Sequence, residues 1–499
     1  MEEERKFEVD EAFALPDEFL DAPDVFALPP VRLRATYFDT ADLRLARAGA
    51  SLRFRTGDAE PWTVKLPTAI PGIRREVSLA GPSGRPPAEL ADLVTTFRRS
   101  EPLAPVIVLR TVRQPYELRD GSGTVLAELV DDHVSVLVGR RVVTRFREIE
   151  VERKAGGRDV LDRVAGSLTA AGAVEGEFTA KHVRALGSPA TAPADLAASP
   201  RPVSRKKATA ADVVAGGIRR DIGVIVAHDP LVRLRAEVGR GDTAVHQMRV
   251  GCRRLRSRLR TFAPLLDPRW ADPLRAELSW LASVLGGVRD AEVLRARLGV
   301  TAAADPLAPL DPEIVGELDR ALADRYRDAV TELDAALTSE RYLELLDLLV
   351  TVAAKPGVGR GGRAPAREAL PPFVARTWKR LVRDVRGLRA DGPDEVWHAA
   401  RVRAKRARYA VEAVSSVVGR PAQRLAAALA AVQGDLGEHQ DAALAAETWL
   451  ELGAADPGRY GVTVGRLVER ERGAVVAARG RFAGVWAEAR RGKLTEWLG

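Results

Sequence analysis

Charged residues alternate with apolar ones in several short segments of residues 1–180, so each segment, if extended, carries its charges on one face. The alternating charged residues are Glu2, Glu4 and Lys6, then Arg53 and Arg55, Arg74 and Glu76, Glu128 and Asp132, and Glu148, Glu150 and Glu152. On one strand such a face usually means only a solvated side of a sheet. Its repetition on many strands favours a lined cavity. Carboxylates bind hard divalent cations while Arg and Lys bind phosphate oxygens, so the cavity would suit a metal-bound polyphosphate.

The segments that carry these residues have the length and spacing of β-strands. They are predicted at residues 2–9, 52–55, 62–66, 74–79, 106–113, 124–130, 134–137 and 146–152, with Gly and Pro between them. Such regular short strands are typical of an antiparallel sheet or barrel. The opposite faces are apolar, as at Phe7, Phe54 and Val151. We therefore expect the charged faces to line the interior and the apolar faces to pack outward against helices.

From about residue 212 the sequence changes to helical periodicity, and two helices carry basic stripes with spacings of three and four residues. The stripes are formed by His246, Arg249, Arg253, Arg256 and Arg260, and, 152 residues after the first histidine, by His398, Arg401, Lys405 and Arg408. Arg254 and Arg406 follow the third residue of each stripe. A Leu-Gly-x-x-x-Asp element ending at Asp290 recurs at Asp441, at an offset of 151 residues. The near-equal offsets indicate an internal repeat.

Each stripe has an ordinary explanation, because a basic helix face is usually only solvated and a histidine is often a core or capping residue. Two matching copies favour a bound anion instead, since like charges four residues apart repel by roughly a few tenths of a kcal/mol per pair. Both histidines follow expected helix starts, where the helix dipole favours anions and a neutral imidazole that could donate a hydrogen bond to phosphate. Asp290 and Asp441 are expected to orient neighbouring groups.

Charge is divided unevenly along the chain. Residues 1–200 contain 27 Lys and Arg against 31 Asp and Glu, a net −4, and the remaining residues contain 50 against 38, a net +12, which together give +8. The basic part should attract polyanions. Residues 187–211 are rich in Ala, Pro, Ser and Thr and are interpreted as a linker. The glycine-rich residues 356–362 interrupt the helical pattern and separate its two repeats.

Composition excludes several other classes of protein. The one cysteine, Cys252, excludes an intrachain disulfide framework and any multi-cysteine zinc site. No apolar run approaches the ~18 residues of a membrane span, and the acidic beginning of the chain differs from a signal peptide. We expect a cytoplasmic protein that binds no membrane.

The N-terminal half resembles the CYTH family, the triphosphate tunnel metalloenzymes. The matching motifs are Glu2-x-Glu4-x-Lys6, Tyr37-Phe38-Asp39-Thr40-Ala41-Asp42, Leu52-Arg53-x-Arg55, Trp62-Thr63-x-Lys65-Leu66-Pro67, Arg74-x-Glu76, Thr111-x-Arg113, Glu128-x-x-Asp131-Asp132, Glu148-x-Glu150-x-Glu152 and Lys181. The resemblance implies an eight-stranded antiparallel tunnel that binds triphosphate with Mg²⁺ or Mn²⁺. It implies metal ligands or catalytic carboxylates at Glu2, Glu4, Asp132, Glu148, Glu150 and Glu152. It further implies triphosphate contacts at Lys6, Arg53, Arg55, Lys65, Arg74, Arg113 and Lys181.

The C-terminal half resembles the CHAD domain, the conserved-histidine α-helical domain, through its two basic stripes and the Leu-Gly-x-x-x-Asp elements. The resemblance implies two pseudo-symmetric helical bundles around a basic groove that binds inorganic polyphosphate. The residues implied are those of the two stripes with Arg254 and Arg406, and Lys379 and Arg380 would widen the basic surface. The expected protein is thus an α+β multidomain chain, with a CYTH domain at residues 1–186, a linker at 187–211 and a CHAD domain at 212–499, whose repeats span about 212–352 and 370–499.

A CYTH domain followed by a CHAD domain is a known bacterial pairing. It suggests that the helical half captures long phosphate chains and that the tunnel hydrolyses triphosphate or short chains, a coupling that fails if the separated halves act on long chains as fast as the intact protein. One alternative is a binding protein of polyphosphate granules with a slow or regulatory tunnel. Another is an adenylate cyclase or thiamine triphosphatase. Nucleic-acid binding is disfavoured because few aromatics accompany the basic stripes to stack bases.

Overall fold

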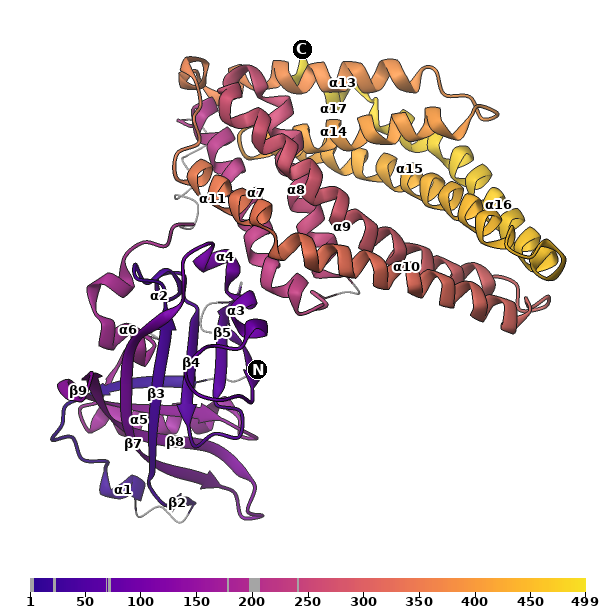
Figure 1. Ribbon diagram of the computed structural model, residues 1–499. Helices are drawn as coiled ribbons and strands as arrows, with labels where there is room; N and C mark the ends of the chain where they lie inside the picture. The colour runs from indigo at the N-terminus through magenta and orange to yellow at the C-terminus, as the bar shows by residue number, and fades with distance from the viewer. Residues whose placement is uncertain are drawn as a thin grey trace. The chain divides into compact units, whose positions relative to one another are not determined.

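The computed structural model describes residues 4–20, 24–68, 70, 73–176, 179–196, 207–239 and 242–499. Contacts within the chain divide it into two compact units, residues 1–197 and 198–499. The first unit is built on an antiparallel β-sheet and the second consists of helices (Figure 1). The predicted fold class, an α+β chain with a sheet domain before an all-helical one, is confirmed.

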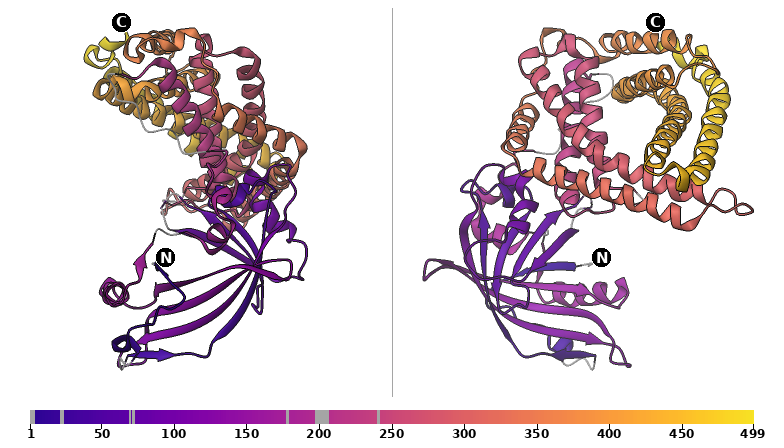
Figure 2. Two further views of the ribbon diagram at one scale, coloured as in Figure 1. Left: turned by 90° about the vertical axis from the view of Figure 1, so that its left-hand side faces the viewer. Right: turned by 45° about the vertical axis from the view of Figure 1, so that its right-hand side comes forward.

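The sheet of the first unit has ten strands, and every pair of neighbours is antiparallel. They are β1 (Glu4–Val9), β2 (Val25–Ala27), β3 (Val31–Asp39), β4 (Ser51–Thr56), β5 (Trp62–Pro67), β6 (Arg74–Leu79), β7 (Ala104–Arg119), β8 (Val125–Val138), β9 (Arg141–Arg153) and β10 (Val174–Glu175). Their order is β10-β1-β9-β8-β7-β3-β4-β5-β6, with β2 paired to β7. The sheet is strongly curved (Figure 2).

Strand number and closure differ from the expected eight-stranded tunnel. Ten strands are present, of which β2 and β10 are only three and two residues long. In the described part of the chain β6 does not pair with β1 or β10, so the sheet is not closed. β3 was missed by sequence reasoning, although its residues alternate. The two strands expected at 124–130 and 134–137 are one continuous strand, β8.

The continuity of β8 has a physical cause at its two adjacent aspartates. Asp131 accepts two hydrogen bonds from the Arg147 guanidinium, at 2.8 and 2.6 Å. Asp132 accepts two from Arg113, at 2.9 and 2.7 Å. Successive side chains of a strand point to opposite faces, so each carboxylate binds a different arginine. Because both carboxylates are paired, the strand can continue without a turn that would expose them to water.

The apolar face of β1, β7, β8 and β9 packs against α5 (Arg158–Ala170). Phe7 of β1 and Ile149 of β9 are fully buried there, together with Leu161 and Leu168 of the helix. Burial of this face fixes the strand register, because a shift by one residue would turn the apolar set outward. The charged residues are thereby held on the opposite face.

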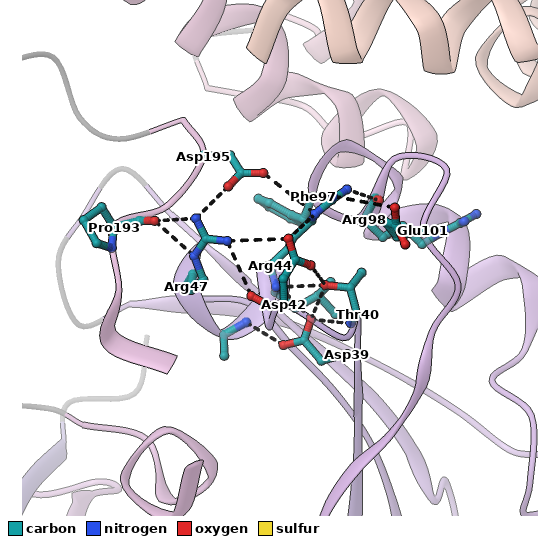
Figure 3. A network of polar contacts seen from close by, with 12 residues as sticks. Asp39, Thr40, Asp42, Arg44, Arg47, Phe97, Arg98, Glu101, Pro193 and Asp195 are labelled. Carbon is teal, nitrogen blue, oxygen red and sulfur yellow. Dashed lines mark hydrogen bonds and ion pairs between the residues drawn. The ribbon is translucent and has the colours of Figure 1, made fainter. Parts of the chain in front are cut away.

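A polar network stabilises the turn between β3 and α2 (Arg44–Arg47), as Figure 3 shows. The Asp39 carboxylate at its centre is only 3% exposed. It accepts backbone hydrogen bonds from Thr40 at 2.7 Å and from Leu45 and Ala46 at 2.9 Å each. One side chain thus satisfies three amides that the turn and the start of α2 would otherwise leave without acceptors.

The same network holds the segment that leads toward the linker. Asp195 accepts a hydrogen bond from Arg47 at 2.6 Å (Figure 3). It accepts another from Arg99 at 2.5 Å. Arg47 also donates to the carbonyl oxygen of Pro193, at 2.6 and 3.0 Å. The first part of the expected linker is therefore attached to the N-terminal unit as far as Asp195.

Replacing Asp39 by alanine should destabilise the N-terminal unit by about 3 kcal/mol, because three amides lose their acceptor in a buried site. Urea denaturation monitored by tryptophan fluorescence measures this change. Asp42→Ala is the matched control, because Asp42 lies in the same turn but its carboxylate accepts from the side chains of Thr40 and Arg44 at a half-exposed site. The control should lose less than about 1 kcal/mol. Equal losses in the two variants would contradict the assigned role of Asp39.

The C-terminal unit contains nine longer helices among the described residues. They are α7 (Ala210–Arg233), α8 (Ala244–Thr261), α9 (Pro268–Ala302), α10 (Pro312–Thr338), α11 (Glu340–Ala354), α13 (Pro371–Val385), α14 (Asp394–Val418), α15 (Arg420–Gly453) and α16 (Pro457–Ala489). Each of α7, α8 and α9 packs on the next helix along the chain, and so does each of α13, α14 and α15. The same succession of four helices thus occurs twice. No helix in the described part of the chain is long and apolar enough to span a bilayer.

Candidate functional sites

The charged faces of the strands surround a cavity of about 600 Å³ in the N-terminal unit. The predicted site residues that line it are Glu4, Lys6, Arg53, Arg55, Lys65, Arg74, Arg113, Asp132, Glu150, Glu152 and Lys181. Glu148 lies next to the cavity and contacts Lys181 rather than the open space. Glu2 lies outside the described residues.

Strand register gathers the acidic residues on one side. β1 pairs with β9 so that Glu4 lies opposite Glu152 and Lys6 opposite Glu150. On the other edge of β9, Asp132 of β8 lies opposite Glu148. Directly opposed residues of antiparallel strands share a face. Acids that are far apart in the sequence therefore form one carboxylate wall.

Lys181, the first residue of α6 (Lys181–Leu186), joins three of these carboxylates. Its Nζ lies 2.6 Å from Glu148, 2.8 Å from Glu150 and 3.1 Å from Asp132. Burial alone would lower the pKa of the ammonium, but the three carboxylates outweigh burial and raise the pKa above its usual range. Lys181 is therefore a permanently charged centre of the wall.

Lys6 lies between Glu4 and Glu150. Its Nζ is 3.3 Å from Glu4 and forms a short ion pair with Glu150. Burial raises the pKa of the Glu4 carboxyl; Lys6 opposes this shift and Glu150 reinforces it. For Glu150, burial acts in the same direction, but the charges of Lys181 and Lys6 outweigh it and hold the pKa well below its usual range. Two neighbouring carboxylates thus differ in how readily they take up a proton.

The other side of the cavity is basic and comes from β4, β5 and β6. Arg53 carries a buried Nε that has no hydrogen-bond acceptor among the described residues. Burial lowers the pKa of the Arg74 guanidinium, although Glu4 acts in the opposite direction. Lys65 pairs with Glu76 on the neighbouring strand, and Arg55 donates to Asp58 at 2.5 Å. A buried guanidinium nitrogen without an acceptor is costly unless an anion binds there.

Two further residues of the cavity were missed by sequence reasoning as site residues. His182 stacks on Tyr37, with ring centroids 4.7 Å apart and an interplanar angle of 12°. Its Nε2 is buried and has no partner in the described part of the chain. Burial lowers the pKa of His182 to about 3, and the charges of Arg74 and Arg53 act in the same direction. The imidazole is therefore neutral. The only sequence signal was its position directly after Lys181.

In the C-terminal unit the two basic stripes lie on helices α8 and α14, which contact one another. The charges of Arg253 and Arg249 lower the pKa of Lys405 on the opposite helix, after the larger effect of burial, and bring it to about 6. Burial also lowers the pKa of Arg401, and the charges of Arg253 and Arg249 act in the same direction, while Asp441 opposes them. Guanidinium and ammonium groups of the two repeats are thus crowded together, at a cost that a polyanion would offset.

The repeats also share an arrangement around their first arginine. Arg249 lies 3.7 Å from Asp290, and Arg401 lies 3.4 Å from Asp441. In both arginines Nε is buried without an acceptor among the described residues. Gly286 leaves room for the Arg249 guanidinium, because a Cβ at this glycine would lie 3.3 Å from it.

Not every residue predicted for the basic groove lies in the crowded contact between α8 and α14. Arg254 and Arg408, one from each helix, both approach Glu412, at 3.6 and 2.7 Å. Lys379 lines a separate surface pocket on α13. His398 is exposed and lies 2.5 Å from the Gln440 side chain, as Nδ1 to Oε1.

The remaining predicted groove residues differ from one another in their surroundings. His246 is partly buried, and its Nδ1 has no partner in the described chain. The two repeats therefore hold their histidines differently. Arg256 faces like charges along its own helix. Arg260, Arg380 and Arg406 meet at a further pocket, which α8, α13 and α14 form together.

Comparison with known proteins agrees with both halves. The sequence model of the CYTH domain family matches residues 1–183, and the sequence model of the CHAD domain family matches residues 216–450. The uncharacterized protein Rv2226 of Mycobacterium tuberculosis strain H37Rv is 31% identical over 505 aligned positions, which cover 94% of this chain and 93% of that protein. The chain belongs to the CYTH–CHAD family.

Solved structures resemble parts of this CYTH–CHAD protein. PptA from Streptomyces chartreusis aligns with 56% of the chain and 99% of its own, at 25% identity and a TM-score of 0.47. The CHAD domain of the plant Ricinus communis aligns with 59% of the chain and 96% of its own, at 21% identity and a TM-score of 0.44.

Membership places the CYTH domain in the class of triphosphate tunnel metalloenzymes, which use divalent metal ions. Within the described residues, no three His, Cys, Asp or Glu side chains are grouped closely enough to enclose an ion, and the cavity carboxylates are paired with Lys6, Lys181 and Arg113. The donor chemistry nevertheless fits, because the acidic wall offers only carboxylate oxygens, the ligands that Mg²⁺ and Mn²⁺ prefer.

Proposed function

We propose that the CYTH domain hydrolyses inorganic triphosphate and short polyphosphates with Mg²⁺ or Mn²⁺, and that the CHAD domain binds inorganic polyphosphate. The observation that carries the proposal is the division of one cavity into an acidic and a basic side, with the buried Arg53 Nε left without an acceptor. A hydrogen-bond donor left open in this way fits a condensed phosphate.

Each side of the cavity would have its own task. Arg53, Arg55 and Arg74 would hold the phosphate chain and neutralise the charge that develops on the leaving group. Glu4 and Glu150 would hold the metal, which supplies further charge neutralisation when bound. A carboxylate of this wall that does not hold the metal would orient the attacking water and accept its proton.

Polyphosphate binding by the CHAD domain is supported by the crowding of like charges between α8 and α14. A long polyanion lying along both helices would stabilise the charged form of Lys405 beside Arg253. It would also supply acceptors to the buried Nε atoms of Arg249 and Arg401. The matching geometry in the two repeats suits a ligand that is itself a repeat of identical groups.

The substrate is tested by phosphate release from triphosphate, ATP, thiamine triphosphate and long-chain polyphosphate, each with Mg²⁺ or Mn²⁺. We expect triphosphate to be cleaved with a kcat/KM at least about tenfold above that of the two organic triphosphates, because more than half of the side chains that line the cavity are charged. Faster cleavage of ATP or thiamine triphosphate would contradict the inorganic assignment. Absence of release from all four would contradict the enzyme and leave a binding protein.

His182 is expected to donate a hydrogen bond to a triphosphate oxygen. His182→Phe keeps a ring on Tyr37 but removes the nitrogen, so KM for triphosphate should rise by roughly tenfold or more, the usual effect of losing a hydrogen bond to a charged group. Steady-state kinetics measures the change. His133→Phe is the control, because His133 lies on β8 outside the cavity lining. An unchanged KM in His182→Phe would exclude the contact.

A further inference from the structure

A second pocket in the C-terminal unit combines arginines with an apolar wall. It has a volume of about 250 Å³ and lies between the end of α8, the short helix η2 (Ala263–Leu265), α13 and α14. Its basic lining consists of Arg260, Arg376, Arg380, Arg403 and Arg406.

Most of this positive charge is uncompensated. Arg403 is paired with Asp384 at 2.8 Å. The other four arginines form no ion pair with any described carboxylate. Burial lowers the pKa of Arg406 to about 10, and the charges of Arg260 and Arg403 act in the same direction. Several like charges around one small pocket require an anion of high charge as counterpart.

A buried hydroxyl points to the same conclusion. Ser257 lines the pocket and is 8% exposed. Its Oγ is buried and has no hydrogen-bond partner among the described residues. Buried polar groups are usually satisfied, so this hydroxyl suits a bound ligand.

Part of the pocket wall is apolar and contains an aromatic ring. Ala263, Pro264 and Phe373 line it. Phe373 is held against Phe262 by an edge contact at 6.0 Å and 75°, and the Arg376 guanidinium lies 5.8 Å from the Phe373 ring centre. A bare phosphate chain would leave this wall unused, whereas a planar heterocycle could stack on the ring and on the guanidinium.

We propose that this pocket binds a nucleoside polyphosphate, with the base against Phe373 and the phosphates on Arg260, Arg380 and Arg406. The pocket is smaller than those that enclose drug-sized ligands, so it takes the base and the nearest phosphates and leaves the rest of the chain exposed. This inference goes beyond the proposed function and does not depend on it, because neither triphosphate nor polyphosphate carries a base.

Photolabelling of the full-length protein with 8-azido-ATP in EDTA, followed by peptide mapping, tests the proposal. We expect label in peptides from α13 or from residues 257–264. ATP should protect these peptides at a concentration at least about fivefold below that of tripolyphosphate, since stacking of one base contributes roughly 1–3 kcal/mol. Label confined to the N-terminal unit, or equal protection by the two competitors, would overturn it.

Variants separate the pocket from the other sites. Phe373→Leu and Arg380→Gln should each raise the ATP concentration needed for protection by about fivefold or more. Arg386→Ala, at the C-terminal end of α13 and outside this pocket, should not. Protection unchanged in both pocket variants would refute the assignment. Polyphosphate binding and triphosphate hydrolysis are measured separately, so their failure would leave the labelling result interpretable.

Discussion

Glu150→Gln should lower the rate of metal-dependent triphosphate hydrolysis by about 100-fold or more, the usual loss when a group of the electrostatic machinery is removed. Glu150 occupies the centre of the acidic wall, where Lys6, Lys181 and Arg113 all approach it. The amide can neither keep these cations neutralised nor serve as an anionic metal ligand. Phosphate release at saturating metal and triphosphate measures the effect.

Glu8→Gln is the matched control for this substitution. Glu8 belongs to the same strand and the same alternating series as Glu4 and Lys6, but it is exposed and lies outside the cavity. Its substitution should change the rate by less than about threefold, as expected for an exposed ion-pairing residue. Circular dichroism checks that both variants are folded. A Glu150→Gln enzyme as active as the control would remove the acidic wall from the mechanism.

Polyphosphate affinity should fall as pH rises, by up to about tenfold per unit between pH 8 and 9.5. Burial and the charges of Arg253 and Arg401 lower the pKa of Lys405 to about 6, so the free protein holds this amine neutral in that range. A bound polyanion stabilises the charged form and raises the pKa, so binding takes up a proton. Calorimetry in buffers of different ionisation enthalpy measures both the affinity and the proton uptake.

Lys405→Arg provides the control, because the guanidinium keeps its charge throughout this range and should flatten the pH dependence. His246 does not contribute above pH 8, since burial lowers its pKa from an ordinary value of 6.5. The stability of the folded protein should depend on pH in the opposite direction to the polyphosphate affinity. The folded pKa of Lys405 lies below the unfolded one, so the native state holds fewer protons and the stability of the free protein should rise with pH above 6. If polyphosphate affinity depended equally on pH in the unchanged protein and in Lys405→Arg, Lys405 would be excluded as the titrating group.

The charged face of the sheet could be predicted because alternation along a strand is a local property. The alternation determines that Glu4 and Lys6 share one face of β1 and that Glu148, Glu150 and Glu152 share one face of β9. The partners across strands could not be predicted, because register depends on burial of the apolar face against α5. The turn that was expected between Asp131 and Val134 illustrates this. Two adjacent aspartates suggest a solvent-exposed turn unless it is known that Arg113 and Arg147 bind them.

In the helical half, helix periodicity predicts which residues share a face of one helix but not what lies opposite. The stripe positions of Arg249 and Arg401 could be predicted in this way, including their symmetry. The partnership of Arg254 with Glu412 could not, because it depends on how α8 and α14 cross, whereas Arg408 and Glu412 are four residues apart on α14. Lys379 and Arg380 are adjacent in the sequence, yet they line different pockets, because neighbouring residues of a helix point in different directions.

The most direct measurement is phosphate release from tripolyphosphate by the full-length protein, with Mg²⁺ or Mn²⁺ present and again after chelation by EDTA. The proposed function predicts release that requires the metal and returns when the ion is restored. No release with either ion, or release that continues at the same rate in EDTA, would contradict it.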